Sequence, residues 1–176
     1  MPTSGSTAAF WIEFVPANTE TNVASDPKIR RSEKTESLIA GAALLTRMPI
    51  FGASDRRVVA GFAPVHVVMG NNDVPEVADW GAPETLQIEL EGVRIGMIHD
   101  SGPKQGRAAR LRRRFPTADL VVFGHSHIPL YEAGEGLRIL NPGSPTDRRR
   151  QPTGTVATLD LRDGAVVDAR MERLPT

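Results

Sequence analysis

Three of the four histidines in this chain stand where a β-strand is expected to end. His99 closes the apolar segment VRIGMIH, and His125 and His127 follow the segment LVVFG. Asn71 follows a third segment of this kind, PVHVVMG. In α/β sheets, ligands bind in the crevice beyond the carboxyl ends of the strands. We therefore expect these four side chains to face one site, whereas His66, in the middle of its segment, is expected to be structural.

The residue types at these strand ends suit a divalent metal. Imidazole nitrogen is the commonest metal-binding group among side chains, and an H-x-H pair can direct both rings at one ion or one ring at each of two ions. A mixed set of imidazole nitrogens and an Asn oxygen fits Mn, Ni, Zn or Fe better than Ca. Each histidine taken alone is also compatible with a hydrogen-bonded structural role. Their joint occurrence at strand ends favours the metal site.

Composition excludes several other kinds of protein. The 176 residues suit one domain with a small appendage, and the absence of Cys excludes disulfide scaffolds, Cys-ligated zinc and thiol nucleophiles. Lys plus Arg and Asp plus Glu each number 21, so the net charge is zero and nucleic acid is not the expected partner. No signal peptide and no apolar run long enough to span a bilayer are found. We therefore expect a soluble cytoplasmic protein without a membrane partner.

Residues from 63 onward predict a layered α/β fold. Two hairpins are expected, one over 86–97 around Glu91-Gly92 and one over 155–171 around Asp163-Gly164, because such pairs favour tight turns. Residues 120–123 are uniformly apolar, which predicts a short strand buried on both faces. Residues 103–115 predict a helix with an Arg-rich, solvated outer face.

The first 62 residues differ from the rest of the chain. The opening stretch and residues 16–25 are rich in small and polar residues, as in loops. A helix is expected over 32–47, ended by Pro49, and no strand pattern is evident. The chain is therefore divided into an atypical N-terminal segment, 1–62, and a core, 63–176.

Four short motifs occur in an order that is typical of one enzyme family. They are GNND at 70–73, IH at 98–99, GHSH at 124–127 and NPGS at 141–144. In this order they resemble the motifs of the calcineurin-like metallophosphoesterases, in particular the small phosphodiesterases of the YfcE type, over residues 63–176. The resemblance implies an α/β fold, a four-layer αββα sandwich, here with an atypical N-terminal segment.

The resemblance also implies a site with two divalent metal ions. Asn71, His99 and His125 match the ligands of one ion, and His127 matches a ligand of the other. Asn72 matches the residue that faces the substrate phosphate and is the candidate catalytic residue; it can donate a hydrogen bond but cannot act as an acid. A metal-activated hydroxide would then hydrolyse a small phosphodiester without a covalent enzyme intermediate.

The remaining ligands of the family pattern are missing from the N-terminal segment. The family opens with D-x-H and G-D motifs, but residues 1–62 contain neither a histidine nor a Gly-Asp pair. The nearest counterparts are Asp26 and Asp55, which we expect to be a helix cap and a loop residue. Lys28 stands where the histidine of D-x-H would be, and a protonated amine repels a metal. One bound ion and impaired catalysis are therefore the alternative to two ions.

Two classes of function stay open. The first is a metal-dependent phosphodiesterase, with a small phosphodiester as its partner; Arg148, Arg149 and Arg150, just after NPGS, could attract this anion through their local field. The second is a non-catalytic scaffold or binding module, because the retromer subunit that resembles these phosphoesterases serves protein contacts. A homo-oligomer is left open. A carboxylate from residues 1–62 within reach of His127 would favour the enzyme.

Overall fold

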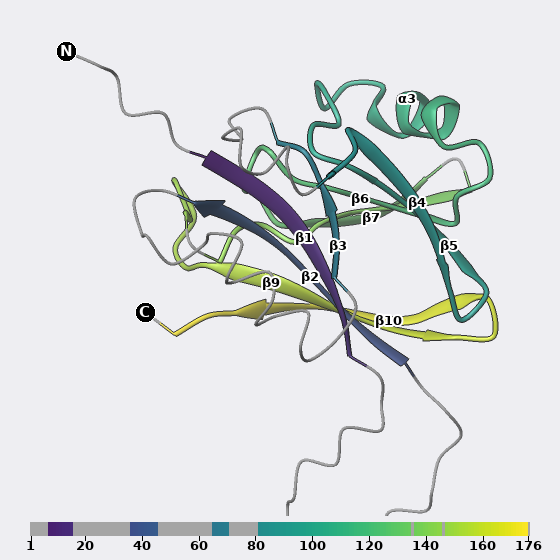
Figure 1. Ribbon diagram of the computed structural model, residues 1–176. Coiled ribbons are helices and arrows are strands. Elements are labelled where there is room, and N and C mark those ends of the chain that lie inside the picture. The colour runs from purple at the N-terminus through teal and green to yellow at the C-terminus, as the bar shows by residue number, and fades with distance from the viewer. Residues whose placement is uncertain are drawn as a thin grey trace, which may run out of the picture.

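A computed structural model describes residues 7–15, 36–45, 65–70, 81–134, 136–145 and 147–175 of the chain. These residues form two five-stranded sheets and one helix (Figure 1). No helix among them is long and apolar enough to cross a bilayer.

The first sheet is antiparallel throughout and has the strand order β10-β9-β2-β1-β3. It combines strands from the two ends of the chain, because β2 pairs with both β1 and β9. Its strands are β1 (Thr7–Val15), β2 (Glu36–Leu45), β3 (Val65–Val68), β9 (Thr155–Arg162) and β10 (Ala165–Arg173).

The second sheet is mixed and has the order β4-β5-β6-β8-β7. Its three central strands β5, β6 and β8 are parallel, and the edge strands β4 and β7 are antiparallel to their neighbours. The carboxyl ends of β5 and β6 therefore lie side by side. The strands are β4 (Thr85–Leu90), β5 (Val93–Ile98), β6 (Leu120–Phe123), β7 (Leu130–Gly134) and β8 (Leu137–Asn141).

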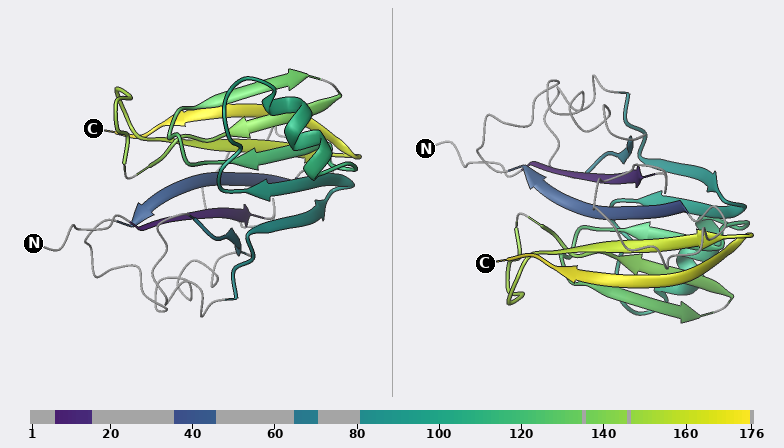
Figure 2. Two further views of the ribbon diagram at one scale, coloured as in Figure 1. Left: turned by 90° about the horizontal axis from the view of Figure 1, so that it is seen from above. Right: turned by 90° about the horizontal axis from the view of Figure 1, so that it is seen from below.

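Strand β6 is buried on both faces, which confirms the interpretation of its apolar run. Leu120 and Val122 belong to the core between the two sheets, and Val121 and Phe123 pack on the other side with the helix α3 (Arg107–Arg114). Figure 2 shows the hairpin of β9 and β10 alongside the strands of the second sheet. The sheets thus form a sandwich, with α3 on its outer face.

Both predicted hairpins are present and their turns touch. Glu91 and Gly92 have φ angles of 48° and 76°, and Asp163 and Gly164 have φ angles of 49° and 74°. Two successive residues with positive φ are typical of the type I′ turns that suit tight hairpins. The Gly164 amide donates to the Glu91 carbonyl at 2.7 Å, which joins the two sheets at this end.

The expectation for the N-terminal segment is wrong in two respects. Residues 36–45, inside the predicted helix, form the strand β2, and residues 7–15 form a second strand where no strand pattern was evident. A short apolar run cannot be assigned to helix or strand by its periodicity alone. Here the pairing of β2 with β1 and β9 decides the outcome, and such long-range pairing leaves no local signal.

The Arg-rich face of α3 is only partly solvated, contrary to the prediction. Arg107 stacks over the Phe123 ring, 4.9 Å from its centroid, and Arg112 donates to the carbonyl oxygens of Ala118 and Gly136, both at 2.8 Å. Arginine carries five donors in a planar fork, which suits it to hold several carbonyls at once. The helix side chains therefore anchor neighbouring loops as well as facing water.

Replacing Gly96 by Ala is expected to destabilise the sandwich by about 1–3 kcal/mol. A Cβ at this position in β5 would lie 2.7 Å from the Phe115 ring, which is itself buried beneath α3. Gly134→Ala in β7 is the matched control, because a Cβ there meets nothing within 4 Å. Thermal unfolding should show a lower midpoint for Gly96→Ala and little change for the control. Equal midpoints for the two variants would contradict this packing.

Candidate metal centre

Two of the predicted site residues, His99 and His125, come together at the ends of β5 and β6. His99 follows β5 directly, and the Gly124 amide, after β6, donates to the His99 carbonyl at 2.8 Å. As a result His99 Nε2 and His125 Nδ1 lie 3.3 Å apart, and the two rings meet edge to face with their centroids 5.3 Å apart. The parallel pairing of the two strands thus brings the His99 and His125 rings together.

The separation of these two nitrogens suits a shared metal ion. Histidine nitrogens lie about 2.0–2.1 Å from zinc, so two of them in tetrahedral arrangement are about 3.4 Å apart. The observed 3.3 Å is close to this value. The donor set fits a divalent ion of the zinc or manganese kind, with His99 and His125 as the residues that would hold it.

The His127 ring is oriented by the loop that follows the NPGS motif. His127 is only 2% exposed, and its Nδ1 lies 2.6 Å from the carbonyl oxygen of Asp147. A carbonyl oxygen only accepts hydrogen bonds, so Nδ1 carries the proton and the Nε2 lone pair is available to a metal. A hydrogen bond of this kind behind a ligand nitrogen is typical of metal sites.

The backbone of the GHSH loop is held in an uncommon conformation. His125 and His127 have φ angles of 63° and 59°, in the left-handed region that residues other than glycine rarely adopt. Strain of this type gathers at functional sites and persists only where the surroundings enforce it.

Asn141 enforces that conformation from the end of β8. Its side chain is fully buried, and its amide nitrogen donates to the Gly124 carbonyl at 2.8 Å and to Ser126 Oγ at 3.0 Å. Its oxygen accepts from the Gly143 amide at 2.9 Å. One side chain therefore fastens the GHSH loop to the NPGS turn.

Ser144 completes the connection to His127. Its hydroxyl accepts from the Asp147 amide at 3.0 Å, and its own carbonyl accepts from the Thr155 amide at 3.0 Å. These contacts place the Asp147 carbonyl against the His127 ring. The contacts of Asn141 and Asp147 with this loop were not predicted from the sequence, in which the NPGS turn pattern was their only sign.

The environment keeps two of the histidines neutral. Burial, reinforced by the neighbouring His125 ring, lowers the pKa of His99 to about 4. Burial also lowers the pKa of His127, although the Asp147 carbonyl partly opposes this shift. Metal ligands must be deprotonated, so both imidazoles are in the ligand form at neutral pH.

The metal-free protein is expected to lose stability as the pH falls from about 6.5 to about 4. In this window the unfolded chain protonates His99 whereas the folded chain does not, so protonation favours unfolding. The loss ascribed to His99 is at most about 3 kcal/mol. Urea unfolding of the wild type and of His99→Asn, with a chelator present and over this pH range, measures the loss of unfolding free energy. An equally steep pH dependence in the two proteins would contradict the expected contribution of His99.

The other candidate residues lie outside the described part of the chain. These are Asn71, Asn72, Asp26 and Asp55. The segment that precedes Asn71 is connected to the end of β5 through β4: the Met69 amide donates to the Pro83 carbonyl at 2.9 Å, and Thr85 at the start of β4 pairs with Ile98. Among the described residues, no three His, Cys, Asp or Glu side chains form a complete metal cluster.

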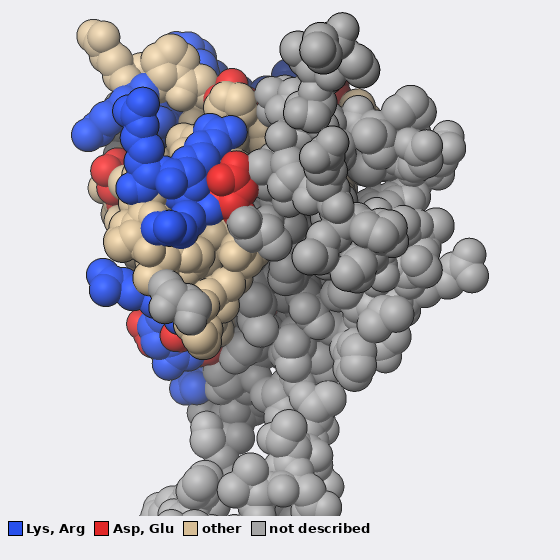
Figure 3. Space-filling model, turned by 90° about the vertical axis from the view of Figure 1, so that its left-hand side faces the viewer, with Lys and Arg blue, Asp and Glu red and all other residues tan. Residues whose placement is uncertain are grey.

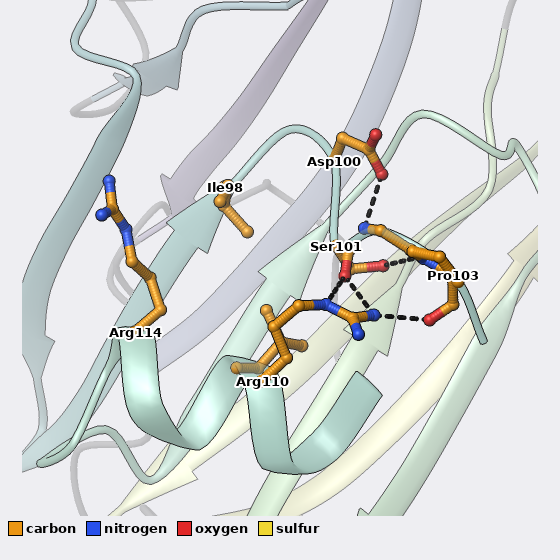
Figure 4. Close-up of a pocket in the computed structure, with 8 residues that line it drawn as sticks. Ile98, Asp100, Ser101, Pro103, Arg110 and Arg114 are labelled. Atoms are coloured by element: carbon orange, nitrogen blue, oxygen red, sulfur yellow. Dashed lines mark hydrogen bonds between the residues drawn. The ribbon is translucent and has the colours of Figure 1, made fainter. Parts of the chain in front are cut away.

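The loop that follows His99 is fixed from the helix side of the second sheet. Arg110 donates to the Ser101 carbonyl from Nε at 2.9 Å and from a terminal nitrogen at 2.8 Å, and it also donates to the Pro103 carbonyl (Figure 4). A pocket of about 280 Å³ opens beside this clamp, lined in part by Ile98, Asp100 and Arg114. Arg110 thus stabilises the loop beside the centre.

Comparisons with known proteins agree with this architecture. Residues 49–164 match the family model of the calcineurin-like phosphoesterase superfamily domain. A probable metallophosphoesterase of Methanothermobacter thermautotrophicus is 34% identical over 114 residues, which cover 63% of each chain. One of Mycoplasma pneumoniae is 31% identical over 57% of this chain and 64% of its own. The chain therefore spans less than two thirds of the length of these relatives.

Solved structures show the same fold. A variant of Vps29 from Entamoeba histolytica superposes with a TM-score of 0.56 at 25% identity, over 72% of this chain and 77% of its own. Wild-type Vps29 of this organism, solved in complex with Zn²⁺, superposes with a TM-score of 0.55 at 23% identity, over 70% and 76% of the two chains. The expected α/β metallophosphoesterase fold is confirmed, and the chain belongs to the calcineurin-like phosphoesterase superfamily.

Proposed function

We propose that this chain is a metal-dependent phosphodiesterase. The observation that carries the proposal is the pair of imidazole nitrogens, 3.3 Å apart, at the ends of two parallel strands. The neutral state of His99 and the orientation of His127 by the Asp147 carbonyl support it, since metal ligands must be deprotonated. Membership in the phosphoesterase superfamily supplies the reaction class.

In this proposal Asn71, His99 and His125 hold one divalent ion and His127 contributes to a second. The bound ions would supply Lewis acidity towards the phosphoryl oxygens and an activated water. Asn72 donates its amide hydrogen to a phosphate oxygen and so orients the ester. In the reaction a water oxygen bonds to phosphorus, the ester P–O bond breaks, and the leaving oxygen receives a proton.

The second candidate function is a scaffold that binds another protein without catalysis. The likeness to Vps29 favours it, because that fold match covers 72% of this chain at 25% identity. The two candidates differ in the number of ions bound and in hydrolysis.

Metal analysis of protein purified with Mn²⁺ distinguishes them, with bis(p-nitrophenyl) phosphate as the test diester. The phosphodiesterase proposal expects two ions per chain and hydrolysis in the wild type, and loss of both in His125→Ala. Asp26→Asn and Asp55→Asn would each show whether that carboxylate supports the second ion. One ion or none, without hydrolysis, would overturn the proposal in favour of the scaffold.

A further inference from the structure

Arg149 differs from the two arginines beside it. Arg148 donates to the Gln151 and Pro152 carbonyls and so closes its own turn. Arg150 is exposed and makes no hydrogen bond or ion pair within the described residues. Arg149 instead places Nε 3.8 Å from the Asp147 carboxylate.

This contact holds the Arg149 guanidinium beside the His127 ring. The same carboxylate oxygen of Asp147 lies 3.6 Å from His127 Nδ1, so two contacts of less than 4 Å link the guanidinium to the ring. The positive charge of Arg149 also contributes to the lowered pKa of His99 and of His127. Through Asp147, the cation is therefore held close to the His127 ring.

The Arg149 backbone is adapted to this position. Its φ angle of 48° lies in the left-handed region, and its amide donates to Asp147 Oδ1 at 3.1 Å. A residue other than glycine adopts this conformation at a cost that the surrounding structure must offset. The turn thus directs one particular side chain of the Arg run towards Asp147.

The guanidinium keeps donors for a further ligand. Its side chain is 46% exposed, and its terminal NH₂ groups make no hydrogen bond within the described residues. Such a planar fork suits bidentate recognition of phosphate. Lys and Arg also cover more of the described surface than Asp and Glu on the side of the molecule where β9 begins (Figure 3).

We propose that Arg149 binds a non-bridging oxygen of the substrate's phosphoryl group, oriented by the Asp147 carboxylate next to His127. The inference rests on the proposed function. It adds a residue that is not a metal ligand, Arg149, as a binding group for the phosphate anion. Arg150 is not part of this contact, although it carries the same charge one residue later.

Calorimetric titration with inorganic phosphate tests the assignment on metal-free and Mn²⁺-loaded protein. Arg149→Ala is expected to weaken phosphate binding about tenfold to a hundredfold, and Arg149→Lys less. Arg150→Ala is the matched control and should leave the affinity within about twofold, because it removes only an exposed, screened charge. Metal content and the unfolding midpoint should be unchanged in all three variants, which separates anion binding from a structural role.

The outcomes also separate this inference from the proposed function. If the wild type hydrolyses the diester but Arg149→Ala and Arg150→Ala bind phosphate alike, the assignment of Arg149 is overturned and the phosphodiesterase proposal stands. If the wild type hydrolyses nothing, a selective loss of phosphate affinity in Arg149→Ala still supports the anion site. A wild type that binds no phosphate in either form overturns the assignment.

Discussion

Replacing Asn141 by Ala is expected to weaken Mn²⁺ binding by about tenfold to a hundredfold, the usual cost of losing a residue that orients metal ligands. The Asn141 side chain acts on the loop that carries His125 and His127. It holds the Gly124 carbonyl, Ser126 Oγ and the Gly143 amide, and these contacts maintain the left-handed backbone of His125 and His127. Without them the loop should relax, and the imidazoles should lose their common orientation.

Equilibrium dialysis with Mn²⁺, together with thermal unfolding, measures this effect. Ser126→Ala is the matched control, because it removes one of the three partners and leaves the other two contacts of Asn141 in place. Its metal affinity should fall by a much smaller factor. If Asn141→Ala lowers the unfolding midpoint but binds Mn²⁺ as tightly as the wild type, the amide stabilises the fold without positioning the histidines.

The parts of the fold that were predictable are those specified by neighbouring residues. The hairpin turns at Glu91-Gly92 and Asp163-Gly164 carry the residue types that tolerate positive φ, and both form as expected. The short run 120–123 was recognisable as a strand buried on both faces because each of its four residues is apolar. In each case the physical cause lies within a few residues.

The predictions that were wrong concern elements that depend on contacts between distant segments. The strand β2 is stabilised by pairing with β1 and with β9, more than 100 residues away along the chain, and its small apolar residues carry no period of two. Arg112 resembles a surface residue in sequence, yet it binds the Gly136 carbonyl 24 residues later. Neither contact can be predicted from the residue types of the surrounding sequence.

In the candidate site, too, some residues have a local sequence signal and others depend on contacts between distant segments. His99, His125 and His127 were proposed because each follows an apolar strand, and the parallel pairing of β5 and β6 brings His99 and His125 together. The groups that orient them are a buried amide and a backbone carbonyl, those of Asn141 and Asp147. Every residue has a carbonyl oxygen, so the sequence does not indicate which of them accepts a hydrogen bond from a histidine ring. Only the folded structure shows it.

Replacing Gly143 by Ala is expected to be the most damaging single methyl addition among the described glycines, with a loss of stability of about 3 kcal/mol or more. Gly143 has a φ of 79°, and a Cβ there would collide with Thr155 Oγ1 and lie 3.0 Å from the Pro129 ring. Thr155 is buried and is held through its amide by Ser144, so it cannot withdraw easily. Since domains of this size are stable by only about 5–15 kcal/mol, the variant should unfold at a markedly lower temperature.

Two comparisons separate the causes of this loss. Gly136→Ala places a methyl group at a φ of 71° with nothing within 4 Å, so it measures the backbone cost alone, about 1–2 kcal/mol. The double variant Gly143→Ala with Thr155→Ala removes the colliding hydroxyl and should recover part of the difference in a double-mutant cycle. Because Gly143 lies between Asn141 and Ser144, the single variant should also lose Mn²⁺ affinity. Equal unfolding midpoints for Gly143→Ala and Gly136→Ala would show that the collision with Thr155 is relieved by movement of the turn.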